Sequence, residues 1–262
     1  MRHLRLNKRA GFTLVELMIV LVIISILVFA LTPSLIGFIT QARDTAEMAE
    51  NRNDLIAEQL AAMGLTTYGY PNDFIPGLPD VGAGGDTIKI NGEEFDTEEF
   101  LVEIKSKGLT SADIGPLSRL THVLILSLDN NQIEDISALG SLSTLYSLSL
   151  SYNNISDISA LKGMTKVDWL HLGANKIHDI GVLGGLTQLE YLILWNNQIN
   201  DLSPLKDLTK LRHLDLRENN ISDISALFGL SNLRHLDLSG NPVGEQQIAE
   251  LRAALPNCTI LF

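Results

Sequence analysis

Residues 148–155 read Leu-Ser-Leu-Ser-Tyr-Asn-Asn-Ile, and this spacing of leucine, asparagine and isoleucine returns every 22 residues along the second half of the chain. The asparagines of successive copies are Asn131, Asn153, Asn175, Asn197, Asn219 and Asn241. In the last copy Val243 replaces the isoleucine. A constant period predicts structural units that stack, each burying its leucines against its neighbours and none stable alone. We therefore expect repeats over residues 109–244, with a short strand in each coil.

The pattern Leu-x-Leu-x-x-Asn-x-Ile is identified as a leucine-rich repeat. Its 22-residue length and the run Asn-x-Ile-x-Asp-Ile resemble the internalin-type class. This resemblance implies an α/β solenoid, with short parallel strands on the concave face and short helical or irregular segments on the convex face. We expect the domain to span 96–262, with a cap helix over 96–108 opened by an Asp96/Glu99 capping box and a carboxy-terminal cap over 245–262.

Two polar columns of the repeat are interpreted as structural. The asparagine amide can satisfy backbone groups at each turn that no regular ladder reaches. An aspartate column accompanies it, made of Asp135, Asp157, Asp179, Asp201 and Asp223. Its spacing lacks the close multi-carboxylate loop that calcium needs, so turn capping is the favoured role. Cys258 is expected to be a buried packing residue without thiol reactivity.

Ligand binding is expected on the concave face, where residues that alternate with the buried leucines point outward. The middle coils place Trp and Tyr there, and these residues are frequent in recognition sites when they face solvent. The candidate binding residues are Trp169, His171, Tyr191, Trp195, His213, Asp215, Arg217, His235 and Asp237. A metal site built from the stacked His-Leu-Asp motifs is less favoured than solvated polar residues, because nothing supplies a second shell of ligands.

The amino-terminal part has a different character. Residues 12–39 are almost wholly apolar, and as a helix rising about 1.5 Å per residue they would exceed the ~30 Å hydrocarbon core of a bilayer. Basic residues in the leader 1–11 predict a cytoplasmic amino terminus and a translocated remainder. We expect an amphipathic stalk over 40–63, and a Gly/Pro-rich linker over 64–95 with a hairpin at Asn91-Gly92.

One charge, Glu16, interrupts the apolar run. The sequence Lys-Arg-Ala-Gly at 8–11, followed by Phe-Thr-Leu-Val-Glu at 12–16, resembles the processing site of type IV prepilins and of the pseudopilins of secretion systems. The resemblance implies that a prepilin peptidase cleaves after Gly11 and methylates Phe12. It also pairs Glu16 with the first amino group of a neighbouring subunit, which would offset the cost of burying both charges. Other pilin or pseudopilin subunits are therefore expected partners.

Two alternatives for this segment stay open. The run Val28-Phe29-Ala30 satisfies the small-residue rule for an ordinary signal peptidase, which would release a soluble repeat protein. The segment could also stay uncut as a simple membrane anchor. Glu16 and the length of the apolar run favour the pilin-like interpretation. The predicted location is the inner (cytoplasmic) membrane in a single pass, with the head outside the cytoplasm, in a pilus or at the cell surface.

Composition and motifs exclude several functions. The formal net charge of −12 disfavours a nucleic-acid partner, because phosphate backbones are bound by clustered Lys and Arg. The sequence lacks a phosphate-binding glycine loop, a His-Glu-x-x-His motif and a nucleophile elbow. We expect neither catalysis nor a cofactor. The expected partner of the concave face is a protein or glycan ligand.

Overall fold

The computed structural model describes residues 86–97 and 99–262, which belong to the second of two compact units, Asp80–Phe262. The predicted leader, membrane helix and stalk lie outside the described residues, as does the predicted linker up to residue 85. Within the described ranges, no helix combines the length and apolar character that a bilayer crossing requires.

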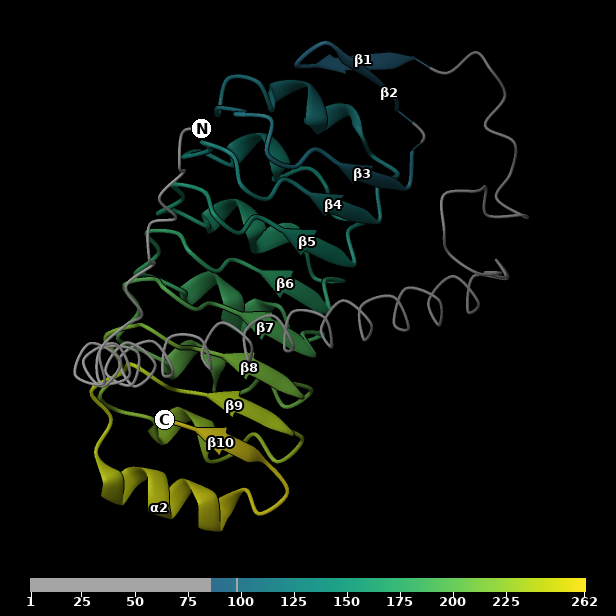
Figure 1. The fold of residues 1–262 in the computed structure, drawn as a ribbon. Helices are drawn as coiled ribbons and strands as arrows, with labels where there is room; N and C mark the ends of the chain where they lie inside the picture. Colours follow the sequence, from purple (N-terminus) through teal and green to yellow (C-terminus); the bar gives the residue numbers. More distant parts are fainter. Residues whose placement is uncertain (1–85, 98) are drawn as a thin grey trace, which may run out of the picture. The chain divides into compact units, whose positions relative to one another are not determined.

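A single parallel sheet runs through the whole repeat domain. Its eight strands follow one another in sequence order (Figure 1). They are β3 (Leu101–Glu103), β4 (Ile125–Ser127), β5 (Ser147–Ser149), β6 (Trp169–His171), β7 (Tyr191–Ile193), β8 (His213–Asp215), β9 (His235–Asp237) and β10 (Thr259–Leu261). From β4 to β9 each residue pairs with the residue 22 positions later, as Leu148 does with Leu170. The predicted repeats and their parallel strands are therefore confirmed.

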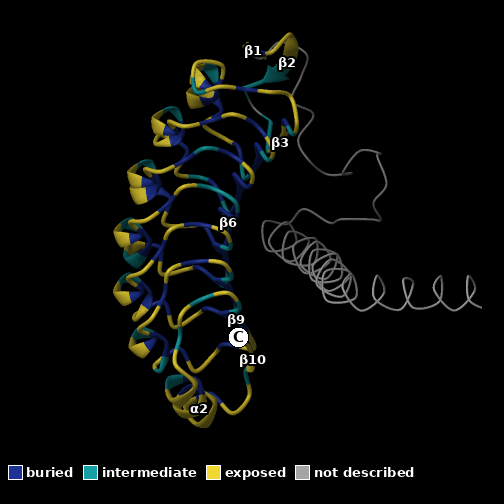
Figure 2. Ribbon diagram, turned by 60° about the vertical axis from the view of Figure 1, so that its left-hand side comes forward, coloured by how far each residue is buried: buried dark blue, intermediate teal, exposed yellow. Residues whose placement is uncertain are grey.

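The outer side of each coil is a short 3-10 helix. These helices are η1 (Gly115–Arg119), η2 (Ser137–Leu139), η3 (Ser159–Gly163), η4 (Gly181–Gly185), η5 (Ser203–Leu205) and η6 (Ser225–Leu227). Figure 2 shows the strands on the inner, concave side of the curved repeat domain and these segments on the outer side. Between the two layers lies a continuous core, in which the central leucine of each strand from β4 to β8 is fully buried.

The asparagine column joins each coil to the one before it. Asn219 accepts a hydrogen bond from the backbone N–H of Ile199 at 3.0 Å, and its amide nitrogen donates to the carbonyls of Leu194 and Leu216, both at 3.0 Å. The same pattern recurs at Asn131, Asn153, Asn175, Asn197 and Asn241. The predicted structural role of this column is confirmed.

The aspartate column caps the outer turns. The Asp157 carboxylate accepts the backbone N–H of Ser159 at 2.8 Å, at the start of η3. Equivalent bonds to the residue two positions later are made by Asp135, Asp179, Asp201 and Asp223. Each bond satisfies one donor that the short helix leaves without a partner. The prediction of turn capping is confirmed.

A hairpin stands at the amino-terminal end of the repeat domain. Strands β1 (Thr87–Ile90) and β2 (Glu93–Asp96) pair antiparallel around Asn91 and Gly92, whose φ angles are 49° and 83°. Two positive φ angles favour this dipeptide in a tight hairpin turn. The predicted hairpin is confirmed. It contributes Ile88 and Ile90 to the repeat core, so it covers the first coil rather than forming part of a free linker.

The predicted cap helix over 96–108 is wrong. One hydrogen bond of the capping box is present, since the backbone N–H of Asp96 donates to the Glu99 carboxylate at 3.2 Å. The chain nevertheless continues into β3, which pairs with β4. The burial of these residues alternates, because Val102 and Ile104 are buried while Leu101 is exposed. Two buried residues at spacing two fit a strand and complete the sheet.

The carboxy-terminal cap is present as predicted. Helix α2 (Glu245–Ala254) buries Ile248 and Leu251 against the last coil, and β10 then adds a final strand to the sheet. Cys258 lies between them and is partly buried against the core, less completely than predicted. Burial raises the pKa of its thiol to about 11, which disfavours the reactive thiolate.

The asparagine column yields a stability prediction. Replacing Asn219 by Ala leaves one buried N–H and two buried carbonyls without these partners, which should lower the free energy of unfolding by about 2–4 kcal/mol. Urea denaturation followed by circular dichroism measures the loss. Asn196, whose side chain is exposed, serves as the control, and its replacement by Ala should cost less than about 1 kcal/mol. Equal losses in the two variants would contradict the structural role.

Candidate functional site

The concave face presents three columns of side chains whose stacking follows from the strand register. The first column pairs Ser147, Trp169, Tyr191, His213 and His235 in order. The second pairs Ser149, His171, Ile193, Asp215 and Asp237. The third follows two residues further along each coil and includes Gly173, Trp195 and Arg217. The predicted candidate residues therefore share one face, but their exposure differs.

Contrary to the prediction, Trp169 does not face solvent, since only 5% of its surface is exposed. Its ring meets the His171 ring edge-on, with centroids 5.8 Å apart and planes at 89°. Adjacent parallel strands are only about 4.8 Å apart, so a large ring on this sheet is covered by its neighbours. Trp169 therefore packs against His171 within the face, whereas Trp195 is half-exposed.

Asp129 joins the first coils of the face through hydrogen bonds to three serines. Its carboxylate accepts hydrogen bonds from the hydroxyls of Ser127, Ser149 and Ser151, and from the backbone N–H of Ser151 at 2.8 Å. Burial raises the pKa of this carboxyl, but the three serine hydroxyls outweigh burial and hold the pKa below its usual value. Asp129 is therefore a fixed negative charge among the small residues of the early coils.

Trp195 lies flat across the neighbouring coil. A Cβ atom at Gly173 would come within 2.5 Å of the indole, so only glycine leaves room for this arrangement. The indole reaches Tyr152, two coils away, with ring centroids 5.2 Å apart and planes at 71°. Tyr152 is 50% exposed. The two rings form an open aromatic corner, which we call the Tyr152–Trp195 corner.

Tyr152 was absent from the sequence-based candidates because it lies outside the three alternating columns. It stands directly before Asn153 and has a φ of 53°, a left-handed conformation that redirects the side chain. The same position is occupied in the other coils by Asn130, Ala174, Asn196, Glu218 and Gly240. An aromatic residue among these small or polar ones was the signal in the sequence.

His171 lies between Trp169 and Trp195. Its ring centroid is 6.3 Å from that of Trp195, and its Nε2 atom is buried and makes no hydrogen bond within the described part of the chain. Burial lowers the pKa of His171 to about 4, although the Asp129 charge acts in the opposite direction. The imidazole is therefore neutral at physiological pH.

A row of rings continues along the first column. Tyr191 stacks on His213 with centroids 6.2 Å apart, and His213 lies 5.7 Å from His235. Burial, the neighbouring His235 and Arg217 together lower the pKa of His213 to about 4. His213, in the middle of this row, is therefore neutral at physiological pH.

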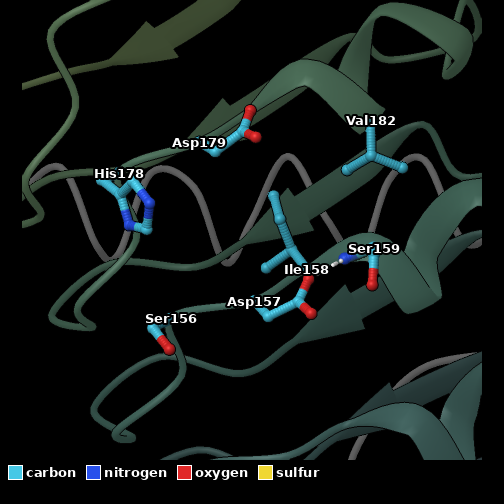
Figure 3. A pocket seen from close by; sticks show the side chains of 7 residues that line it. All are labelled: Ser156, Asp157, Ile158, Ser159, His178, Asp179 and Val182. Carbon is cyan, nitrogen blue, oxygen red and sulfur yellow. Dashed lines mark hydrogen bonds between the residues drawn. The ribbon is translucent and has the colours of Figure 1, made fainter.

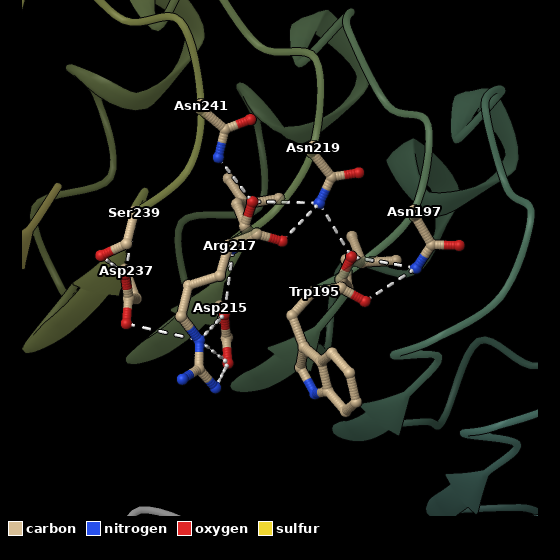
Figure 4. A network of polar contacts seen from close by, with 10 residues as sticks. Trp195, Asn197, Asp215, Arg217, Asn219, Asp237, Ser239 and Asn241 are labelled. Carbon is tan, nitrogen blue, oxygen red and sulfur yellow. Dashed lines mark hydrogen bonds and ion pairs between the residues drawn. The ribbon is translucent and has the colours of Figure 1, made fainter. Parts of the chain in front are cut away.

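Arg217 links the two carboxylates of the last coils (Figure 4). Its guanidinium donates to Asp215 at 2.6 Å and lies 3.4 Å from Asp237. A metal ion would have to compete with this cation for both carboxylates, which lie in a different column from the two histidines. Among the residues with described side chains, no group of three or more His, Cys, Asp or Glu suits a metal ion.

A hollow with a volume of about 400 Å³ is lined by residues outside the strands (Figure 3). Its walls include Asp157, Asp179 and His178. Both carboxylates already accept the N–H groups of the turns they cap. We therefore regard this hollow as a product of turn geometry, and the concave face as the candidate site.

Family comparisons agree with both halves of the sequence. The family described as prokaryotic N-terminal methylation motif matches residues 6–32, which include Gly11, Phe12 and Glu16. Leucine-rich-repeat families match residues 121–163, 165–207 and 187–243. The chain is a leucine-rich-repeat protein with a prepilin-type methylation motif. The three motif residues lie outside the described part of the structure.

Solved structures similar to this leucine-rich-repeat protein include two internalins and a further leucine-rich-repeat protein. An internalin (inlF) from Listeria monocytogenes is 44% identical with a TM-score of 0.56, over 57% of this chain and 44% of that one. Internalin C2 from the same organism is 31% identical with a TM-score of 0.50, over 62% and 80%. A leucine-rich-repeat protein from Leptospira interrogans is 32% identical with a TM-score of 0.53, over 56% and 39%. A comparison with curated proteins gave no match.

The two neutral histidines make the stability of the repeat domain depend on pH. Their native pKa values of about 4 lie below the value of about 6.5 in an unfolded chain, so unfolding takes up protons between these limits. The contribution of these histidines to the free energy of unfolding is therefore fully present above about pH 6.5, and it decreases as the pH falls toward 4. At pH 5 we expect a loss of about 1–2 kcal/mol per histidine, or roughly 2–4 °C in Tm for each kcal/mol.

Thermal unfolding of the full-length protein in detergent at pH 7.5 and pH 5 measures this loss by circular dichroism. Replacing His171 by Gln removes its titration and should shrink the difference in Tm, whereas replacing the exposed His178 by Gln should leave it unchanged. If the difference in Tm between pH 7.5 and pH 5 is the same in both variants, His171 is not the neutral buried group described above.

Proposed function

We propose that this protein is a pilin-like or pseudopilin-like subunit that displays a leucine-rich-repeat head outside the cytoplasm, where the concave face binds a protein ligand. The observation that carries the proposal is the methylation motif at residues 6–32 in the same chain as a complete, capped repeat domain. One part fits insertion and assembly, and the other fits recognition. Neither part calls for catalysis or a cofactor.

Anchoring rests on the apolar segment that follows the motif. Residues 12–39 are long enough to cross a bilayer as a helix, and Arg2, Arg5, Lys8 and Arg9 precede them. Positive charges on that side favour a cytoplasmic amino terminus, which places the head beyond the inner membrane. In this proposal the protein spans the membrane once.

Assembly rests on Glu16. A carboxylate in hydrocarbon costs about 2.5–3.5 kcal/mol on insertion scales, so it calls for a partner. Cleavage after Gly11 by a prepilin peptidase would create that partner, the amino group of Phe12 on a neighbouring subunit. Pairing of the two charges would register one subunit against the next, in a pilus or a secretion pseudopilus.

Recognition rests on the composition of the concave face. The face carries the half-buried rings of Trp195, Tyr191 and His213, together with exposed Tyr152 and the Arg217 ion pairs. Aromatic and arginine side chains supply much of the affinity in protein interfaces. The rigid parallel sheet holds them in fixed positions, which lowers the entropy lost on binding.

A second candidate is a repeat protein that is released or simply anchored, without assembly. The run Val28-Phe29-Ala30 favours it, because small residues at these positions suit an ordinary signal peptidase. The two candidates differ in whether Glu16 has a function.

Replacing Glu16 by Val tests assembly directly. The variant should insert in the membrane as well as the wild type, because it removes a charge from an apolar helix, but its recovery in sheared filaments should fall about tenfold or more. Immunoblotting of membrane and filament fractions measures both. Leu17→Val in the same segment is the matched control and should be recovered normally. Equal recovery of the Glu16 variant and the wild type would reject the pairing.

A further inference from the structure

Charge is distributed unequally along the concave face. The positions compared are the three strand columns and the residue just before each strand. On the coils of β4 to β7, the charged residues at these positions are Asp129, Asp168 and Glu190, and all three are acidic. The coils of β8 and β9 instead mix Asp215 and Asp237 with three arginines. Glu190 pairs with Arg212 at 3.4 Å.

Asp129 carries a charge that the described residues do not neutralise. Its partners are serine hydroxyls and a backbone N–H, and no Lys or Arg side chain of the described part forms an ion pair with it. The nearest basic residue in the register, Lys105, is bound to Glu103 at 2.8 Å. His171 beside it is neutral at physiological pH. A ligand with positive charge would compete for Asp129 with Lys105, which is already bound to Glu103.

The Tyr152–Trp195 corner is connected to this carboxylate through Ser151, which donates two hydrogen bonds to Asp129 and directly precedes Tyr152. The two rings meet edge to face with their planes at 71°, and Tyr152 is 50% exposed, so part of its ring is open to a cation. Tyr152 keeps a left-handed φ of 53° that a bulky side chain rarely adopts.

We propose that the Tyr152–Trp195 corner binds a basic side chain, a lysine or an arginine, from an extended segment of a protein partner. This inference rests on the proposed recognition function of the concave face and specifies its chemistry. The aromatic faces supply short-range attraction to the cation, and Asp129 supplies the field that draws it to this end of the sheet. Gly173 keeps the space in which the Trp195 indole lies.

Two substitutions remove the corner without disturbing the coil. Tyr152→Asn introduces the residue that Asn130 and Asn196 place at the same position with φ angles of 56° and 51°, so the backbone should accept it. Trp195→Ser introduces the residue found in the same column at Ser151 and Ser239. Asn196→Ser is the matched control, because it lies next to the corner and its side chain is exposed.

The test is isothermal titration calorimetry of the full-length protein in detergent with hexalysine, at ~0.15 M salt to screen weak surface attraction. Choline chloride and hexaglutamate are the comparison ligands. We expect hexalysine to bind, choline to bind more weakly, and hexaglutamate not to bind. Tyr152→Asn and Trp195→Ser should each weaken hexalysine binding by ~2- to 30-fold, while Asn196→Ser leaves it unchanged.

Two results would overturn the proposal. If all three variants bind hexalysine with the affinity of the wild type, only the general negative charge of the protein attracts the peptide. Tighter binding of choline than of hexalysine, lost in the same two variants, would assign the corner to a quaternary ammonium ligand instead of a protein side chain. Neither result bears on amino-terminal processing or filament assembly, so failure here is distinguishable from failure of the proposed function.

Discussion

The hydrogen bonds of the buried asparagine column determine the rest of the repeat domain. Each asparagine accepts at least one backbone N–H from the preceding coil and donates to carbonyls of both coils, so adjacent coils can stack in only one register. The fixed register aligns the strands residue by residue and brings the same repeat position of every coil into one column. The concave face, its aromatic corner and its charge distribution all follow from this alignment.

Much of this architecture could be predicted from the sequence because the period is constant. The strands, the asparagine and aspartate columns, the hairpin at Asn91-Gly92 and α2 each have a local signal that the fold does not override. The helix predicted for residues 96–108 does not form, although the Asp96–Glu99 hydrogen bond that suggested it is present. The segment pairs with β4 as a strand instead. Burial of Val102 and Ile104 on a sheet edge gains more than one capping bond provides.

The binding face was harder to predict, since side-chain direction depends on neighbours that a column of letters does not show. Trp169 is covered, whereas Trp195 lies across Gly173 and reaches Tyr152 two coils away. That contact needs a missing Cβ in one coil, a left-handed backbone in another and an indole in a third. Periodicity gives the positions of all three, but only packing shows that they meet.

If a prepilin-type amino terminus delivers this leucine-rich-repeat head, the mature chain begins directly after the cleaved leader. Mass spectrometry of the protein from membranes of cells with and without the prepilin peptidase would identify the first residue. We predict a chain that begins at methylated Phe12 only when the peptidase is present. A chain that begins at Leu31, or an uncut Met1 in both cells, would contradict the claim.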